Sequence, residues 1–475
     1  MDKRPFRFIT SLVPFLVMIT TMLYSVVVLD ITPHIPLIIG AIVAGGIAYF
    51  HGYSWSEIED FMYRGIKLAL PALIIILLVG LVIGSWVGGG IVATMIYYGL
   101  NIISPKYFLV TVVIICSIVS LTIGSAWSTI ATVGIASLGI GVGLNIPLGP
   151  TAGAIVAGAF FGDKMSPLSD TTNLASGLTH TNIFKHIKHM LYTTVPAVII
   201  TLIVFQWYTV KYINNTSVDL NSIETLRQNI SEAFVISPWL LLAPVIVLAV
   251  ILFKVPPAPA LLVGAFLGTL AQLFVQNDSL ASSLTTLIDG FEITTSNESI
   301  DVLFNRGGMM DMMFVVTMTF VAMSFAGIME HSGMLQVILD HILKFAKNTF
   351  GLVSSALLSA IFINLTCAEH YISIIVPGRM FVRPFVDNNL DTSNLSRTLE
   401  DGGTVTSALV PWSTDGVFIY GALGISVLEY GPFAVMNYAA PIIALILAAT
   451  GIGIKKITDD DKLNFYKKYY PNEIK

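Results

Sequence analysis

The sequence predicts an all-α polytopic membrane protein, built from two inverted-topology repeats whose helices are broken in corresponding places. Three observations support this prediction: the composition, the order of the apolar segments, and matches between the two halves of the chain. Of the 475 residues, 55% are hydrophobic and only 11% are charged, whereas soluble domains carry roughly 25% charged residues. So few charges cannot cover a soluble globule of this length, which excludes an ordinary soluble enzyme and a nucleic-acid-binding protein.

The first apolar run, residues 8–29, follows the basic start MDKRPFR. It is too long for the core of a signal peptide and no small-residue cleavage site follows it, so we expect a first spanning helix. The basic residues before it place the N-terminus in the cytoplasm by the positive-inside rule. The Lys-rich tail, residues 455–475, follows another apolar run, 433–454, and is expected on the same side of the membrane.

Further apolar runs approach the roughly 20 residues that a bilayer requires, and each predicts a spanning helix. They lie near 35–50, 68–87, 190–210, 235–253, 257–275 and 309–329. The basic stretch HTNIFKHIKH (180–189) is expected to be a cytoplasmic loop, and its histidines are interpreted as part of that loop rather than as metal ligands. The polar stretch 213–231 is expected to be an external linker.

Two stretches, 104–180 and 350–430, are apolar on average but are interrupted by Gly, Pro, Ser, Thr and charged residues. Continuous helices do not show this pattern. Irregular backbone survives at membrane depth only where it is buried in protein or lines a cavity. We therefore predict that these stretches hold broken helices around an internal site.

The two halves of the chain match at a nearly constant offset. Arg64 and Arg306 are 242 positions apart (306 minus 64), and Pro167 and Pro411 are 244 apart (411 minus 167). Similar offsets join Gly90 to Gly333, the small residues around Ala126 to those around Ala368, and Pro196 to Pro441.

These matches define repeat one as 8–212 and repeat two as 232–454. With both ends inside and the linker outside, each repeat crosses the membrane an odd number of times, so the two are inverted. Inverted repeats with interrupted helices are typical of secondary transporters, whose site lies near the bilayer midplane. No GxxxxGK[ST] or HExxH motif occurs in the sequence, so we expect a transporter rather than an enzyme.

Ionisable groups inside a membrane are costly and commonly mark ion or proton pathways. A first cluster, GDKMSPLSDTTN (162–173), combines two carboxylates with hydroxyl and amide oxygens, and its proline frees backbone carbonyls by breaking a helix. Na⁺ takes such oxygen ligands. A second cluster, 400–416, is its partner in the other repeat, where Ser413-Thr414-Asp415 mirrors Ser169-Asp170-Thr171. The alternative interpretation of both clusters is a polar loop that caps a helix.

A third cluster, CAEHY (367–371), places a carboxylate beside an imidazole, a pair that can carry protons near neutral pH. Its alternative interpretation is a buried ion pair between Glu369 and Arg379. The fourth cluster, GSAWST (124–129), is the counterpart of the third in repeat one and carries hydroxyls without charge. Plain helix packing by small residues is an equal alternative for this fourth cluster.

Three stretches of the chain resemble the signature stretches of the NhaC family of Na⁺/H⁺ antiporters, which belongs to the ion transporter superfamily. They are GDKMSPLSDTTNLA (162–175), TCAEHYISIIVPGRMF (366–381) and LSRTLEDGGTVTSALVPWSTDGVFIYGALG (395–424). The resemblance implies an elevator-type carrier in the bacterial cytoplasmic membrane, with a scaffold domain that forms a homodimer and a moving domain that holds two re-entrant hairpins. The hairpin segments would be 104–180 and 350–430. The family also includes exchangers of malate for lactate with coupled Na⁺ and H⁺, and some relatives are suspected amino-acid carriers.

The resemblance also implies which residues line a site for Na⁺ and H⁺. Together with three residues of the clusters above, the predicted set is Ser128, Thr129, Asp163, Ser169, Asp170, Thr171, Thr172, Asn173, Glu369, His370, Asp401, Ser413, Thr414 and Asp415. Within it, the expected Na⁺ ligands are Asp170, Thr171, Asn173, Ser413 and Asp415.

Asp170 is the first candidate for a carboxylate that Na⁺ and H⁺ share, because its protonation would abolish the cation site. No cofactor is expected apart from Na⁺ as the transported or coupling ion. An organic anion would instead require a cationic pocket, for which Arg379, His370 and Lys164 are available in the sequence.

Overall fold

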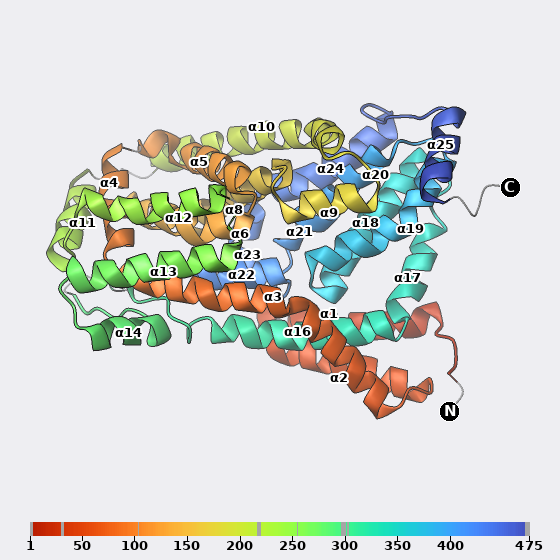
Figure 1. Cartoon of the computed structure of the whole chain (residues 1–475), viewed down its shortest axis with the longest axis horizontal. Helices are drawn as coiled ribbons and strands as arrows, with labels where there is room; N and C mark the ends of the chain where they lie inside the picture. Colours follow the sequence, from red (N-terminus) through yellow and green to blue (C-terminus); the bar gives the residue numbers. More distant parts are fainter. Residues whose placement is uncertain are drawn as a thin grey trace.

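The computed structural model describes residues 3–29, 33–102, 104–215, 220–253, 255–295, 301 and 304–470. Nearly all of these residues are helical, and the β-bridges among them are two isolated pairs, Phe291–Arg306 and Leu390–Lys456. Most of the long helices run along the longest axis of the molecule (Figure 1). The all-α prediction is confirmed for the described residues.

The first half of the chain forms ten α-helices within the described residues. They are α1 (Phe8–Leu23), α2 (His34–Phe50), α3 (Trp55–Gly88), α4 (Ile91–Ile102), α5 (Phe108–Ile123), α6 (Ala126–Thr129), α7 (Ile135–Gly143), α8 (Leu148–Met165), α9 (Asp170–Leu178) and α10 (Ile183–Asn215). A π-helical turn, η3 (Ile130–Gly134), joins α6 to α7.

The second half begins with α11 (Leu220–Ala233), and its order is otherwise similar. The helices that follow are α12 (Leu242–Leu252), α13 (Pro257–Phe274), α14 (Leu280–Asp289), α16 (Met313–His331), α17 (Met334–Leu343), α18 (Thr349–Cys367), α19 (His370–Asp387), α20 (Thr392–Leu399), α21 (Val405–Ser407), α22 (Thr414–Leu423), α23 (Val427–Tyr430), α24 (Val435–Thr450) and α25 (Asp459–Tyr469). Two further π-helical turns occur among the described residues: η1 (Tyr24–Val28) follows α1, and η5 (Glu400–Thr404) joins α20 to α21.

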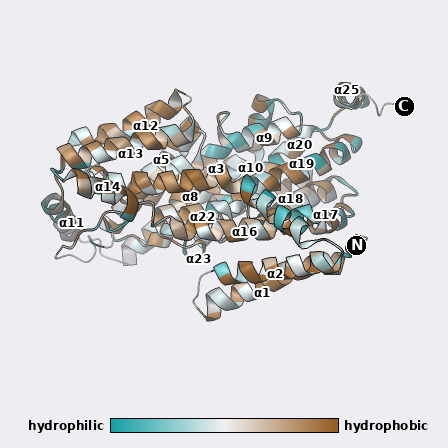
Figure 2. Ribbon diagram, turned by 60° about the horizontal axis from the view of Figure 1, so that its bottom comes forward, coloured by the Kyte–Doolittle hydropathy of each residue, from teal (hydrophilic) through white to brown (hydrophobic). Residues whose placement is uncertain are grey.

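Six helices of the described chain are long and apolar enough to cross a membrane, or up to eight if two bent helix pairs are each counted as one span. The predicted span 68–87 is the second part of α3, a helix of 34 residues that begins with a capping box between Ser54 and Glu57. Apolar residues cover much of α3, α12 and α13 (Figure 2). The prediction of a polytopic membrane protein is therefore confirmed.

The predicted helix breaks take the same form in both halves. After α5, Gly124 adopts a left-handed conformation (φ 76°), and the Ser125 side chain then caps α6. After α18, Ala368 adopts a left-handed conformation (φ 56°), and the Glu369 side chain then caps α19. The two left-handed residues are 244 positions apart (368 minus 124). Alanine is strained in this conformation; the Ala368 carbonyl accepts a hydrogen bond from the Thr414 N–H at 2.8 Å, which ties this break to α22.

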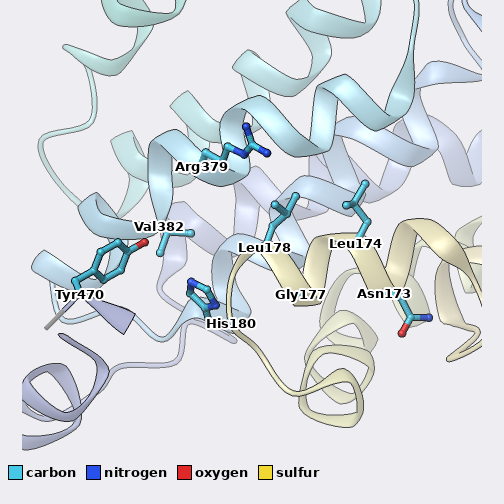
Figure 3. A pocket seen from close by; sticks show the side chains of 8 residues that line it. All are labelled: Asn173, Leu174, Gly177, Leu178, His180, Arg379, Val382 and Tyr470. Carbon is cyan, nitrogen blue, oxygen red and sulfur yellow. The ribbon is translucent and has the colours of Figure 1, made fainter. Parts of the chain in front are cut away.

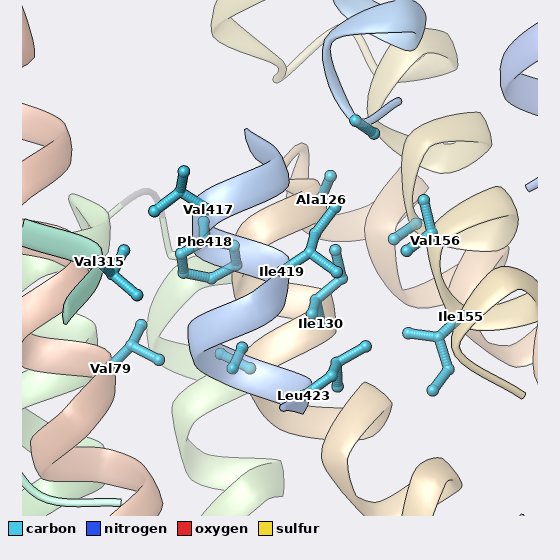
Figure 4. Packing of buried hydrophobic residues seen from close by; sticks show 14 of the residues in the cluster. Val79, Ala126, Ile130, Ile155, Val156, Val315, Val417, Phe418, Ile419 and Leu423 are labelled. Carbon is cyan, nitrogen blue, oxygen red and sulfur yellow. The ribbon is translucent and has the colours of Figure 1, made fainter. Parts of the chain in front are cut away.

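The short helices α9 and α22 follow further breaks, at 166–169 and 408–413. Helix α22 is buried in the middle of the molecule, where Val417, Phe418 and Ile419 are at most 2% exposed. It packs between α3 and α16 on one side and α6 and η3 on the other (Figure 4). A short broken helix can therefore remain inside the membrane region because apolar side chains surround it on both sides.

Both ends of the chain lie at one end of the molecule, and α11 lies at the opposite end (Figure 1). The predicted linker 213–231 comprises the end of α10 and most of α11, with 216–219 outside the described residues. The predicted tail 455–475 forms α25, with 471–475 outside the described residues. The Tyr466 hydroxyl donates a hydrogen bond to Asp387 Oδ1 at 2.8 Å, which fastens α25 to α19.

The prediction of a loop over 180–189 is wrong for most of that stretch, because α10 begins at Ile183. His186 and His189 are buried against α20, where their ring nitrogens lie 2.7 Å from Ser396 Oγ and 3.1 Å from Asn394 Oδ1. The basic composition concealed this helix start, because Lys188 is exposed and Lys185 pairs with Asp391 on the same turns that bury His186 and His189.

Helices α3 and α16 cross at very short distance. A Cβ atom added to Gly65 would lie 2.2 Å from the Met323 carbonyl oxygen and 2.8 Å from Gly327 Cα. A Cβ atom added to Gly327 would lie 2.2 Å from the Phe61 carbonyl oxygen. Small residues at such crossings allow the backbones to approach, which is how helices associate in membranes.

We predict that Gly65→Leu will lower the thermal midpoint of the detergent-solubilised protein, because the helices must separate at a cost of about 1–3 kcal/mol. The measurement is the fraction of monodisperse protein after heating, by size-exclusion chromatography. Gly46→Leu on α2 is the matched control, since nothing lies within 4 Å of its added Cβ. Equal midpoints for the two variants would contradict the close crossing.

Candidate functional site

A cavity of about 670 Å³ lies between α3 and the starts of α6, α9, α19 and α22. These four helix starts follow the breaks described above, and we call them the helix tips. One wall consists of apolar residues of α3, including Leu68, Pro71 and Ile75, with Pro256 and Ala258 beside them. The opposite wall is polar. It brings together seven residues of the predicted set: Ser128, Asp163, Asp170, Thr171, Glu369, His370 and Asp415.

Asp415 lies in the first turn of α22, where two hydrogen-bond donors and the His370 imidazole surround its carboxylate. Trp127 Nε1 donates to its Oδ1 at 2.5 Å, and the Ser407 hydroxyl donates to Oδ2. His370 Nδ1 lies 3.0 Å from the same Oδ2. The side chain is 2% exposed. The start of a helix also favours a negative charge, so this carboxylate is stabilised from both its backbone and its neighbours.

Asp170 occupies the first turn of α9, and its side chain is exposed. The Tyr371 hydroxyl donates to Oδ2 of Asp170, and the Thr171 N–H donates to Oδ1 at 2.8 Å. Because fewer groups surround Asp170 than Asp415, it is the carboxylate of the site with the most open access.

The two aromatic donors are arranged reciprocally. Trp127 is the second residue of α6 and Tyr371 is the second residue of α19, and they are 244 positions apart (371 minus 127). Trp127 reaches the acidic residue of α22 in the second half, whereas Tyr371 reaches the acidic residue of α9 in the first half. Trp127 also stacks on Phe418 of α22, with 4.3 Å between the ring centroids. The tips of each half are therefore bonded to tips of the other half.

Glu369 and His370 face the cavity together, with 3.6 Å between Glu369 Oε1 and His370 Nδ1. The alternative expectation was an ion pair between Glu369 and Arg379. Arg379 instead lines a separate pocket of about 500 Å³ with His180 and Tyr470 (Figure 3). Asn173 also lines that second pocket rather than the main cavity.

The other residues of the predicted set lie outside the cavity lining, and most of them hold the helix tips in shape. Asn173 Nδ2 donates to the carbonyls of Pro167 at 2.8 Å and Ser169 at 2.7 Å. The Ser413 hydroxyl donates to the Ser407 carbonyl at 2.6 Å. Further hydrogen bonds of this kind join Thr172 to the Lys164 carbonyl (3.0 Å), Thr129 to the Ser125 carbonyl (3.0 Å), Ser169 to Thr171 (3.1 Å) and the Thr414 N–H to the Ala368 carbonyl (2.8 Å).

Asp401 lies behind the polar wall in a buried ion pair with Lys164, and both side chains are 0% exposed. The Thr193 hydroxyl donates to Asp401 Oδ1 at 3.0 Å, and Arg397 Nε lies 4.0 Å from Oδ2. Lys164 is thus committed to Asp401 and does not reach the cavity. The cavity lining contains four carboxylates, His370, and no Lys or Arg.

Some residues of the cavity lining carry little signal in the sequence. No local signal marks the α3 wall, because Pro71 and Ile75 belong to an ordinary apolar helix. Trp127, Tyr371 and Thr404 also line the cavity. Trp127 and Tyr371 lie at equivalent positions after matching breaks, and this equivalence could have predicted their reciprocal hydrogen bonds. Within the described residues no group of three or more His, Cys, Asp or Glu is placed to hold a metal ion.

Comparisons with known proteins agree with this picture. Residues 158–452 match the model of the Na⁺/H⁺ antiporter family. The chain is 37% identical to the Na⁺/H⁺ antiporter NhaC of Alkalihalophilus pseudofirmus, over 93% of this chain and 95% of the relative. It is 36% identical to the malate-2H⁺/Na⁺-lactate antiporter of Bacillus subtilis, over 92% and 93%. It is 33% identical to the arginine/ornithine antiporter ArcD of Halobacterium salinarum, over 95% and 93%.

We predict that Lys164→Met will strongly destabilise the protein, because it leaves the Asp401 carboxylate buried without its partner, at about 3–5 kcal/mol. The double variant Lys164→Met/Asp401→Leu should recover much of the loss, since it removes both charges. Folded yield and thermal midpoint in detergent measure both effects. A double variant less stable than Lys164→Met would contradict a simple ion pair.

Proposed function

The chain belongs to the Na⁺/H⁺ antiporter family, and from this membership we propose that it exchanges Na⁺ for H⁺ through the cavity between α3 and the helix tips. A secondary transporter needs a site that binds its ions in turn. The observation that carries the proposal is the composition of the lining: Asp163, Asp170, Glu369 and Asp415, with no Lys or Arg to neutralise them. Such a site attracts either a cation or protons.

Exchange follows from competition for the same carboxylates. Asp163 and Asp170 lie close enough for their charges to interact, and two neighbouring carboxylates rarely both stay ionised unless a cation lies between them. Na⁺ supplies that cation on one side of the membrane, and a proton replaces it on the other. Asp170 is our first choice for the shared carboxylate because it is the most exposed of the four. Oxygens of Thr171 and Ser128 are available as further ligands.

We propose that the two halves, 8–212 and 232–454, are inverted repeats. Three observations support this: the matching breaks at Gly124 and Ala368, the reciprocal aromatic bonds, and the position of α11 opposite both termini (Figure 1). Helix contacts also correspond, since α5 packs on α8 and α10 while α18 packs on η5 and α24. The basic N-terminal residues favour a cytoplasmic location for both ends, in a bacterial cytoplasmic membrane.

The position of the cavity suits an elevator mechanism, which we propose with a scaffold that includes α3 and α13. One wall of the cavity belongs to these helices, and the other wall belongs to the broken helices. Sliding of one group against the other would expose the cavity to each side in turn. The homodimer that the family resemblance implies stays a prediction.

An amino-acid carrier is the second candidate function. The cavity volume of about 670 Å³ lies within the roughly 300–1,000 Å³ of small-molecule sites and exceeds the need of a single Na⁺ ion. Its carboxylates suit a cargo with a positively charged side chain, as the name of the arginine/ornithine relative suggests. An organic anion such as malate would find only His370 as a positive group in the lining.

The decisive experiment uses the purified protein in liposomes that contain a pH-sensitive dye. A Na⁺ gradient imposed alone should drive proton movement, and this result would support simple exchange. The same measurement is repeated with arginine, ornithine, malate and lactate. Proton movement that requires one of these compounds would contradict simple Na⁺/H⁺ exchange and would identify the cargo class.

We predict that Asp170→Asn will reduce Na⁺-driven proton flux by at least about 100-fold, because removal of a charge that binds the ion costs several kcal/mol. Asp340→Asn on α17 is the matched control, since Asp340 is exposed and far from the cavity lining. Both variants should show unaltered size-exclusion profiles. Normal flux in a well-folded Asp170→Asn protein would remove Asp170 from the proposed site.

A further inference from the structure

Glu400 is the first residue of the π-helical turn η5 and is 0% exposed. Single π-helical turns are rare and occur frequently at functional sites. Neither carboxyl oxygen of Glu400 makes a hydrogen bond of good geometry within the described part of the chain. The Thr404 hydroxyl, one turn later, is the donor that faces it. A buried carboxyl group with so little support is costly to ionise.

The surroundings of Glu400 contain both signs of charge. The turn η5 packs against α8, α9, α18, α19 and α24. Several titratable groups face this region from α8, α9, the start of α19, α20 and η5 itself: Lys164, Asp163, Asp170, His370, Glu369, Arg397 and Asp401. The titratable residues of the other two elements are Cys367 on α18 and Tyr438 on α24. Lys164 and Asp401 neutralise each other. Arg397 also lies beside Asp401, with 4.0 Å between Nε and Oδ2, so the carboxylate nearest to both buried cations is Asp401 and not Glu400.

Glu400 also lies directly behind the cavity. Asp163 and His370, which line the cavity, are close enough to interact electrostatically with Glu400. Thr404 lines the cavity and lies one turn from Glu400 on the same helical segment. Asp163 Oδ1 and Thr404 Oγ1 are buried without hydrogen-bond partners in the described structure. The polar atoms between Glu400 and the cavity are therefore available to form hydrogen bonds with a proton-carrying group.

We propose that Glu400 is a second proton-binding residue, separate from the carboxylates that bind Na⁺, and that its protonation controls the Na⁺ affinity of the cavity. This inference rests on the Na⁺/H⁺ exchange proposed above. When Glu400 is ionised, its charge adds negative potential at Asp163, which favours Na⁺. When Glu400 is protonated, that potential is lost and the cavity binds Na⁺ less tightly.

Thermodynamic reciprocity requires the reverse effect as well: Na⁺ in the cavity favours release of the Glu400 proton. The Thr404 hydroxyl gives that proton a route, because it can accept from Glu400 and donate toward the cavity. The proton moves between carboxyl and hydroxyl oxygens, so no other reactant is needed. Glu400 acts through its charge and does not touch the ion.

The test is the pH dependence of Na⁺ binding to the purified full-length protein, measured with radioactive Na⁺ in detergent. Each proton released per Na⁺ bound changes the apparent Kd by about tenfold per pH unit. Glu400→Gln carries no charge at this position, like the protonated form, so we expect it to bind Na⁺ more weakly at alkaline pH. We also expect its apparent Kd to change by about tenfold less per pH unit than that of the unaltered protein. Glu400→Asp keeps a carboxyl and should retain the full dependence. The matched control, Glu232→Gln on the exposed surface of α11, should also retain it.

Infrared difference spectroscopy of the unaltered protein gives a second readout that needs no variant to fold. Addition of Na⁺ should remove the carbonyl band of a buried protonated carboxyl, and this signal should be missing in Glu400→Gln. An unchanged pH dependence in Glu400→Gln, or an unchanged infrared signal, would overturn the role of Glu400 and leave the exchange proposal intact. An unaltered protein that binds no Na⁺ would instead overturn the exchange proposal itself.

Discussion

The fold depends on one constraint: polar backbone and charged side chains inside a membrane protein must find partners within the chain. Four helix breaks place unpaired backbone and four carboxylates in the middle of the molecule. The chain meets this demand by joining the tips across the two halves, through Trp127 to Asp415 and Tyr371 to Asp170. Helix α22 is buried by apolar residues, and Ala368 keeps a strained conformation that Thr414 stabilises. The cavity lies between these joined tips and α3.

The buried charges fall into two groups with different surroundings. The carboxylates of the cavity meet hydroxyl, indole and imidazole donors, which can give way to an ion. Lys164 and Asp401 meet each other and are sealed from the cavity. This separation explains why the lysine of the GDKM stretch does not cancel the acidic character of the site. Glu400 is buried like Lys164 and Asp401, but it is also close enough to Asp163 and His370 of the cavity to interact with their charges.

Composition and apolar run length were sufficient to predict the class of protein, because the bilayer sets both. The breaks were also predictable, since Gly, Pro and charged residues interrupt otherwise apolar stretches. Contacts between distant segments were not predictable: nothing near Pro71 or Ile75 shows that α3 forms a wall of the cavity. Likewise, the basic stretch 180–189 resembled a loop, although His186 and His189 are buried in α10 through partners on a helix about 200 residues later. Clusters of site residues can be predicted from sequence, but their partners on other helices require the three-dimensional packing.

The attachment of the C-terminal helix has a practical consequence. Helix α25 is fastened to the far end of α19 through Tyr466 and Asp387, and the strand-like pair of Leu390 with Lys456 lies beside it. The same α19 begins at His370 in the cavity. A single helix therefore links the cavity to α25, a charged helix in which no residue is buried. A dye or spin label attached to α25 would report movement of α19 relative to α3, without any change to the residues that line the cavity.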